Sequence, residues 1–218
     1  MTAITQSLLT PPLLTRRNMA MAAAAMLALP VTRARAEDDS HDLVRRARTT
    51  METARTDAQF GAAPEYFKRA RAIMVVPQLV KGGFFIGGEG GNGVLMQPSA
   101  DGWNKPLFYT LAAASFGLQI GLEVAEVVMF VMSDRALRAW TTDEVKLGAQ
   151  AGLTVLVIGS NAAAAATTNG NVDVIAWAKS KGAYAGVTLE GSIIKPRTEY
   201  NTQYYGHPVV PEKMLRLS

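Results

Sequence analysis

Cysteine is absent from the 218-residue sequence, and histidine occurs only twice. Without cysteine the chain can form no disulfide, thiolate metal site, cysteine nucleophile or lipid-modified N-terminal cysteine. His41 and His207 are far apart in the chain, and no serine lies in a G-x-S-x-G motif. These absences disfavour a Ser-His-acid triad and a histidine-based metal site. We therefore expect a non-enzymatic protein without a cofactor or a metal.

Acidic residues are missing from the first 36 positions, which contain four arginines. Arg16 and Arg17 precede an apolar run at 19–31, and the A-x-A sequence formed by Ala34 and Ala36 follows it. A basic region, an apolar region and an A-x-A site are the parts of a secretory signal. The apolar run is shorter than the roughly 20 residues that a membrane-spanning helix needs. We expect export, with cleavage after about Ala36.

The mild hydrophobicity of the leader favours a twin-arginine signal, although Met19 replaces the usual phenylalanine. An ordinary Sec signal with two arginines is the alternative. Removing residues 1–36 leaves 18 basic residues against 18 acidic ones, so the basic balance of the whole chain comes from the leader. A neutral mature chain lacks the broad positive field of a nucleic-acid-binding protein. We expect residues 37–218 to form a single periplasmic domain, soluble or peripheral on a membrane.

The first part of this domain has a helical pattern from Glu37 to about Ala58, with Ser40 as a plausible N-cap. Spacings of three and four residues place its apolar side chains on one face. These side chains are Leu43, Ala47, Met51, Ala54 and Ala58. Pro64 then opens a second short helix, where proline is favoured in the first turn.

After Ala72 the sequence becomes rich in valine, isoleucine, phenylalanine and glycine, which indicates strands and turns. The apolar run 111–132 contains Gln119, Glu123 and Glu126, so two consecutive buried strands fit it better than a membrane span. Ser133 is a suitable N-cap for a short helix that follows. The predicted fold class is α+β, with N-terminal helices packed on a strongly curved, largely antiparallel, barrel-like, glycine-rich sheet.

Seven glycines fall within residues 82–96, and the string at 88–93 has the G-x-G-x-x-G spacing of dinucleotide-binding loops. Such a loop must open a helix at whose N-terminus the pyrophosphate lies. Here the strand-like 94–96 follows instead. The glycines at 82–93 therefore predict a tightly bent hairpin with bulges and close backbone packing.

Glu123 and Glu126 are the strongest candidates for a pair of catalytic carboxylates. On a helix they would share one face, but on a strand side chains three positions apart point to opposite faces. Because we assign this segment to a strand, a structural role as a hydrogen-bonded buried carboxylate is favoured over catalysis.

Four blocks of the sequence resemble the SYLF lipid-binding domain and occur in that family's order. They are AIMVVPQLVKGGFFIGGEGGNGVLMQ (72–97), GWNKPLFYTLAAASFGLQIG (102–121), AWAKSKGAYAGVTLEGSII (176–194) and NTQYYG (201–206). The similarity extends from about Leu43 to the C-terminus. It implies binding of anionic phospholipid, such as phosphoinositide in eukaryotic members, through a basic amphipathic N-terminal segment. Bacterial members are typically exported envelope proteins.

We expect basic side chains to pair with phosphate oxygens while two aromatic rings enter the membrane interface. These residues are Arg45, Arg46, Arg48, Tyr66, Phe67, Lys68, Arg69, Arg71 and Lys81. A solvated helix face with Phe67 in the core is the alternative interpretation. Glu89, where relatives often carry a basic or aromatic residue, weakens an anion-binding role for the hairpin. Some eukaryotic members also bind actin, which has no counterpart in the periplasm, so an unidentified envelope protein is the other possible partner.

Overall fold

The computed structural model describes residues 33–58, 60–61, 63–83, 86–100, 102–116, 121–148, 152–159, 172–181, 187 and 189–217. Tertiary contacts divide the chain into two compact units, Met1–Arg33 and Ala34–Ser218. The arginine pair and the apolar run of the expected export signal lie outside the described residues. Apart from Arg33 at the start of the first described helix, the described residues belong to the second unit.

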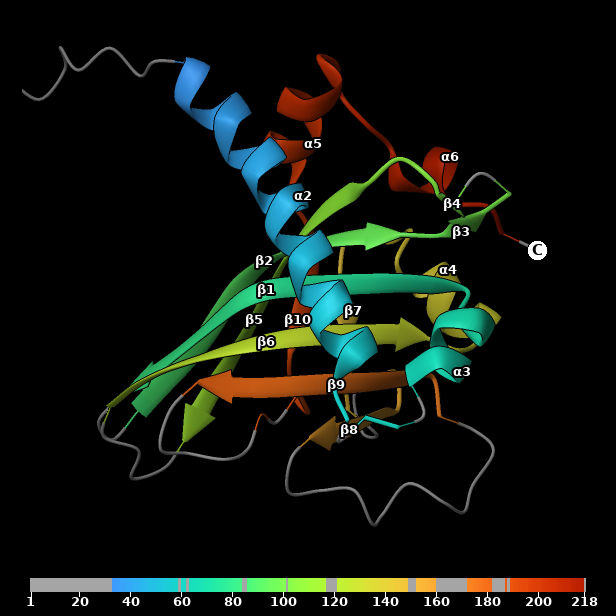
Figure 1. Cartoon of the computed structure of the whole chain (residues 1–218). Helices are drawn as coiled ribbons and strands as arrows, with labels where there is room; N and C mark the ends of the chain where they lie inside the picture. The colour runs from blue at the N-terminus through green and yellow to red at the C-terminus, as the bar shows by residue number, and fades with distance from the viewer. Residues whose placement is uncertain are drawn as a thin grey trace, which may run out of the picture. The chain divides into compact units, whose positions relative to one another are not determined.

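The described elements comprise helices at the beginning and end of the unit, with strands and one further helix between them (Figure 1). The helices are α2 (Arg33–Thr56), α3 (Ala63–Arg69), α4 (Asp134–Ala139), α5 (Thr198–Tyr205) and α6 (Pro211–Met214). The strands are β1 (Ala72–Gly83), β2 (Ile86–Met96), β3 (Pro98–Ser99), β4 (Gly102–Trp103), β5 (Leu107–Phe116), β6 (Gly121–Val131), β7 (Val145–Lys146), β8 (Val155–Gly159), β9 (Val174–Lys181) and β10 (Ile193–Pro196).

Eight of these strands form one curled sheet in the order β7-β10-β5-β2-β1-β6-β9-β8. All neighbouring strands in it are antiparallel except β8 and β9, which are parallel. The first and last strands of this order, β7 and β8, are consecutive in the chain. A β-bridge between Leu147 and Leu153 joins the residues that connect them. The predicted α+β class with a strongly curved, largely antiparallel sheet is confirmed.

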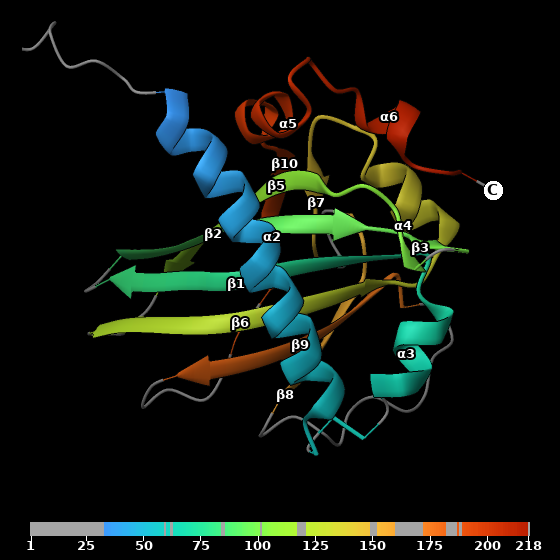
Figure 2. The ribbon, with the colours of Figure 1, turned by 45° about the horizontal axis from the view of Figure 1, so that its top comes forward.

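Side chains of the central strands alternate between two faces, and a separate apolar core covers each face. On the outer face, α2 crosses β1, β6 and β9, and α3 lies near its C-terminal end (Figure 1, Figure 2). On the inner face, α4 packs against a core that includes Tyr109, Met129 and Trp140. The outer core includes Leu43, Ala47, Met51, Ala54, Phe67, Phe130 and Trp177.

The predicted helical face of α2 is confirmed at four of its five positions, since Leu43, Ala47, Met51 and Ala54 are buried. Two details of this helix prediction were wrong. Ala58 is exposed, because the helix ends at Thr56. Ser40 lies inside the helix with its side chain buried, so it is not the N-cap. Among the described helices, none is long and apolar enough to cross a bilayer.

The glycine-rich segment forms the antiparallel hairpin of β1 and β2, as predicted. A register shift next to Pro77 marks a bulge in β1. Opposite this bulge the backbones approach so closely that a Cβ on Gly91 would lie 2.5 Å from the Gln78 carbonyl oxygen. A Cβ on Gly93 would lie 2.9 Å from the Val75 carbonyl oxygen. The G-x-G-x-x-G string runs within a strand, and Gly91 and Gly93 are the glycines that this close packing requires.

The apolar run 111–132 folds as the end of β5 followed by β6, which confirms the prediction of two strands. The expected burial holds for most of β6, but Ala112 and Ala114 at the end of β5 are exposed. The cap of the next helix is also confirmed, because Ser133 Oγ accepts a hydrogen bond of 3.0 Å from the Ala136 amide.

Near the C-terminus, α5 is fixed to the outer face by Asn201. Its side-chain amide donates to the Phe108 carbonyl and its oxygen accepts from the Phe108 amide, both at 2.9 Å.

Candidate functional site

A ridge of charged side chains runs along the solvent-facing side of α2. Arg45, Arg48, Glu52 and Arg55 are spaced by three and four residues and are all exposed. The apolar side of the same helix is buried against the sheet. Three arginines and one glutamate therefore give this ridge a local positive charge, in a domain expected to be neutral overall.

The first arginines of α2 share one carboxylate partner. Asp42 accepts from Arg45 at 2.7 Å and from Arg46 at 2.8 Å, and Arg46 also donates to Gln78 of β1 at 3.2 Å. Arg48 makes no ion pair with any residue that the structure describes. Because such exposed pairs are weak, the arginines remain able to exchange their partner for another anion.

The predicted basic residues of α3 and the segment after it are exposed too. Arg69 pairs with Glu65 at 2.9 Å, and Arg71 pairs with Asp134 at 3.3 Å. Lys68 has no ion pair within the described ranges. We call Arg45, Arg48, Arg55, Lys68 and Arg69 the α2–α3 basic surface.

The two predicted aromatic residues do not point into solvent, which corrects the expectation that they enter a membrane interface. Phe67 is 9% exposed and packs edge-to-face on Phe130, with 5.0 Å between ring centroids. Tyr66 is half-buried and stacks on Phe60 at 5.6 Å. The alternative interpretation, with Phe67 in the core, is the correct one, because α3 needs an apolar anchor on the sheet.

Arg55 belongs to this surface although the sequence analysis did not select it. Its guanidinium lies 4.6 Å from the centroid of the Phe67 ring, within the range of a cation–π contact. This contact joins the end of α2 to α3. The seven-residue spacing between Arg48 and Arg55 is the signal that places both on one helical ridge.

Lys81 does not join the α2–α3 basic surface, which corrects its assignment to the same site. It lies opposite Glu89 of β2 and opposite Glu123 of β6. Directly paired residues project from the same face, and Glu123 alternates with Ala125 and Val127 of the inner core. Lys81 therefore lies on the inner face, between two carboxylates that are 7% and 8% exposed.

Among the described residues, this inner cluster places one lysine, Lys81, between two carboxyl groups, Glu89 and Glu123. Ser180 of β9 donates a short hydrogen bond to Glu123 Oε1. Burial raises the pKa of Glu89; Lys81 opposes this increase and Glu123 adds to it. The sequence analysis missed the approach of Glu89 to Glu123, because it depends on the register of three strands.

Glu126 is half-buried on the opposite side of β6 from Glu123, as the alternation of a strand predicts. The two glutamates of the proposed catalytic pair therefore do not converge. Within the described residues, no group of three or more His, Cys, Asp or Glu side chains is placed to hold a metal ion.

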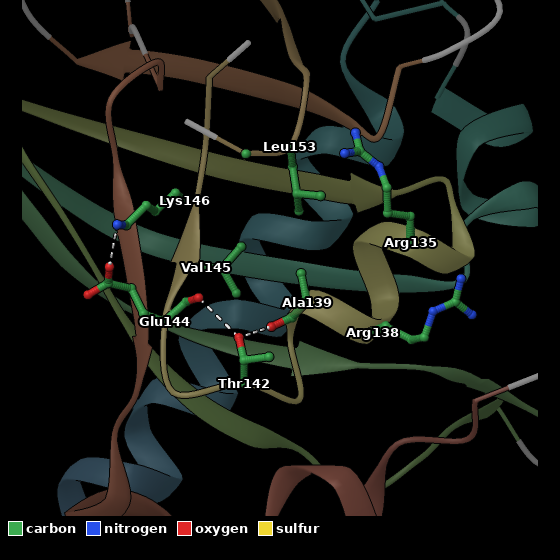
Figure 3. A pocket seen from close by; sticks show the side chains of 9 residues that line it. Arg135, Arg138, Ala139, Thr142, Glu144, Val145, Lys146 and Leu153 are labelled. Carbon is green, nitrogen blue, oxygen red and sulfur yellow. Dashed lines mark hydrogen bonds and ion pairs between the residues drawn. The ribbon is translucent and has the colours of Figure 1, made fainter. Parts of the chain in front are cut away.

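A separate hollow of about 460 Å³ lies between α4, β7 and residues 152–153, and we call it the α4 pocket (Figure 3). Ala139, Val145 and Leu153 lie at its centre. Three cations line it: Arg135, Arg138 and Lys146. No motif in the sequence pointed to this pocket, because its walls come from three separate segments.

The family model for Ysc84, described as Las17-binding protein actin regulator, matches residues 112–218. The chain is 34% identical to Protein YSC84 of Saccharomyces cerevisiae over 156 residues, which are 70% of this chain and 33% of that protein. The chain belongs to the SYLF domain family. This confirms the resemblance drawn from the four sequence blocks.

Two further relatives extend the comparison of this SYLF chain. LAS seventeen-binding protein 3 of S. cerevisiae is 31% identical over 156 residues, covering 70% of this chain and 34% of that protein. SH3 domain-containing YSC84-like protein 1 of Homo sapiens is 31% identical over 139 residues, covering 63% of this chain and 40% of that protein. The chain thus spans about a third to two fifths of these relatives. None of these three relatives is named for an enzymatic activity.

The family model begins within β5, so it includes the α4 pocket and excludes α2 and α3. The match to Protein YSC84 covers 156 residues and is longer than the region 112–218, so it extends N-terminal of that region, but the family model by itself does not cover α2 and α3. The α2–α3 basic surface has to be judged by its own geometry.

Proposed function

We propose that the α2–α3 basic surface binds anionic phospholipid without enzymatic turnover. The observation that carries the proposal is the exposed ridge of Arg45, Arg48 and Arg55, on a helix whose apolar side is already buried. Guanidinium groups suit phosphate oxygens, with which they form paired charge-assisted hydrogen bonds.

The buried state of Phe67 changes the expected mechanism of attachment. With the rings of α3 packed on the sheet, the domain would lie on the headgroups and would not insert side chains into the acyl region. Each basic residue near an anionic surface contributes about 1 kcal/mol, an effect that salt screens. A handful of cations on a nearly neutral domain therefore predicts weak, salt-sensitive binding.

We further propose that this binding occurs at an envelope membrane after export to the periplasm. The support is the basic, apolar and A-x-A sequence of residues 16–36. A fusion of these residues to a reporter that is active only after export would test the location. Retention of the reporter in the cytoplasm would contradict it.

Vesicle co-sedimentation of the full chain tests the lipid proposal. We expect recovery with vesicles containing phosphatidylglycerol, little recovery with phosphatidylcholine alone, and loss of binding as salt increases. The double variant Arg48→Gln/Lys68→Gln should bind several-fold more weakly. Lys105→Gln/Lys213→Gln, which removes two exposed cations outside this surface, is the matched control and should bind normally.

A protein-binding role is the second candidate. It is supported by the names of relatives that denote binding to another protein, LAS seventeen-binding protein 3 among them. Under this alternative the basic surface would be incidental, and both double variants would leave vesicle recovery unchanged. Equal recovery with neutral and anionic vesicles would likewise exclude the electrostatic mechanism.

A further inference from the structure

The α4 pocket combines an apolar floor with a surplus of positive charge at its rim. Ala139 is partly buried, and Val145 and Leu153, which also line the pocket, are buried in the inner core. The methylene stems of the neighbouring arginine and lysine side chains extend this apolar lining. A volume of about 460 Å³ falls within the range of small-molecule sites, roughly 300–1,000 Å³.

Two of the rim cations are already neutralised by carboxylates. Arg135 binds Asp173, whose side chain is only 5% exposed. Lys146 lies 3.2 Å from Glu144, and Lys195 of β10 binds the same carboxylate at 2.9 Å. Two lysines on one glutamate leave a surplus of one positive charge on this side of the pocket.

Arg138 is the remaining cation, and it makes no ion pair with any described residue. It is exposed and lies across Ala139 and Val145 from Lys146 (Figure 3). The four cations and two carboxylates named above carry a net charge of two positive units, which the exposed Asp143, between the lining residues Thr142 and Glu144, reduces to one. An anion at Arg138 would therefore not be repelled by an uncompensated carboxylate among the pocket residues.

The neutral polar side chain that lines the pocket, Thr142, is already hydrogen-bonded within the protein. The hydroxyl of Thr142 lies 2.7 Å from the Ala139 carbonyl oxygen and 3.0 Å from the Glu144 carbonyl oxygen. These contacts occupy the hydroxyl within the protein (Figure 3). Recognition of a ligand by the described lining must then depend on the cations and on the apolar floor.

We propose that the α4 pocket binds a monocarboxylate with an apolar body. The carboxylate pairs with the guanidinium of Arg138, and the apolar body covers Ala139 and the floor. Arg135, held by Asp173, fixes one wall. This site lies on the opposite face of the sheet from α2, so it is independent of the proposed phospholipid surface.

Titration of the full chain with octanoate below its micellar concentration tests this assignment, with amide chemical shifts as the readout. We expect saturable shifts concentrated in α4, β7 and residues 152–153. Acetate has the same head without the body, and octylammonium has the same body with the opposite charge. Both should bind at least about tenfold more weakly if charge and apolar contact act together.

Substitutions in the protein test which residues bind octanoate. Arg138→Gln should weaken octanoate binding by about fivefold or more. Arg48→Gln, at another exposed arginine, on α2, should leave it unchanged. Ala139→Glu, which places a carboxylate over the floor, should abolish the shifts, and its melting temperature confirms folding. Equal binding of octylammonium, unchanged binding by Arg138→Gln, or shifts confined to α2 would each overturn the proposal.

Discussion

Arg135 and Asp173 form a two-point contact between α4 and the start of β9, through Nε at 3.2 Å and a terminal guanidinium nitrogen. Asp173 also accepts from Ser133 Oγ, and from the amide and the hydroxyl of Thr154. Burial alone would raise the pKa of Asp173, but the hydrogen bonds from Ser133, Arg135 and Thr154 outweigh it and lower that pKa. One carboxylate thus connects three segments of the chain.

Replacing Asp173 with Asn should lower the free energy of unfolding by about 2 kcal/mol at pH 7, because an amide cannot satisfy all five donors. The lowered pKa means that this stabilisation is present above the unfolded-state pKa and is lost as pH falls through the folded value. Urea denaturation at several pH values measures both effects. Arg138→Gln, one turn along α4, should change stability by less than about 0.5 kcal/mol; an equal loss in both variants would contradict this role.

Glu89 should make the parent protein less stable as pH rises, the reverse of the effect of Asp173, and Glu89→Gln should remove this pH dependence. Since the pKa of Glu89 is raised above its ordinary value of 4.5, the folded protein binds the proton more tightly than the unfolded chain. Stability must then fall as pH rises from 4.5 through the raised value. The variant, in which Lys81 faces only Glu123, should unfold at a higher urea concentration than the parent at pH 8.

The advantage of Glu89→Gln should shrink toward pH 4.5, where the parent carboxyl is protonated. Glu190→Gln, at an exposed turn, is the control and should show no such trend. A parent protein more stable than Glu89→Gln at pH 8 would mean that the attraction between Glu89 and Lys81 outweighs burial.

Gly91→Ala should destabilise the sheet by about 2 kcal/mol or more, because the new Cβ would meet backbone atoms that cannot move independently. Gly88→Ala on the same strand is the matched control, since its Cβ would lie 3.6 Å from the nearest backbone oxygen, an ordinary contact. Thermal unfolding followed by circular dichroism compares the two. Similar melting temperatures would show that β1 and β2 can separate at the bulge.

Phe67→Leu should lower stability without changing membrane binding, whereas Arg48→Gln should weaken membrane binding without changing stability. Phe67→Leu removes ring contacts with Phe130 and should cost about 1–2 kcal/mol of folding stability, while leaving vesicle binding of the folded protein unchanged. Arg48→Gln should weaken vesicle binding and leave the melting temperature unchanged. A loss of vesicle binding in a fully folded Phe67→Leu variant would instead show that the ring reaches the membrane.

Sequence patterns predicted the features that depend on neighbouring residues. The buried face of α2, the strand pair within 111–132 and the Ser133 cap all follow from local periodicity or capping chemistry. The fate of Phe67 could not be decided in this way, because one apolar ring at the edge of a basic segment fits either a core or a membrane.

Contacts between distant segments escaped the sequence analysis. Lys81 meets Glu89 and Glu123 only after the bulge near Pro77 has shifted the register of β1. Similarly, Asp173 is 38 positions from Arg135 in the chain, and no periodic pattern links the two. Sheet register and the curl that brings α4 to its place are set by the fold as a whole.

The connection between β7 and β8 limits how far this sheet can open. If flat, eight strands would place their outermost members about 34 Å apart. The nine Cα–Cα steps from Lys146 to Val155 could reach at most about 32 Å when fully stretched. Instead, the two ends of this connection lie close together, since the Leu153 amide donates to the Lys146 carbonyl at 3.0 Å. The linker therefore acts as a mechanical tether, so the sheet cannot flatten fully even after this hydrogen bond breaks, and the curl withstands loss of local contacts.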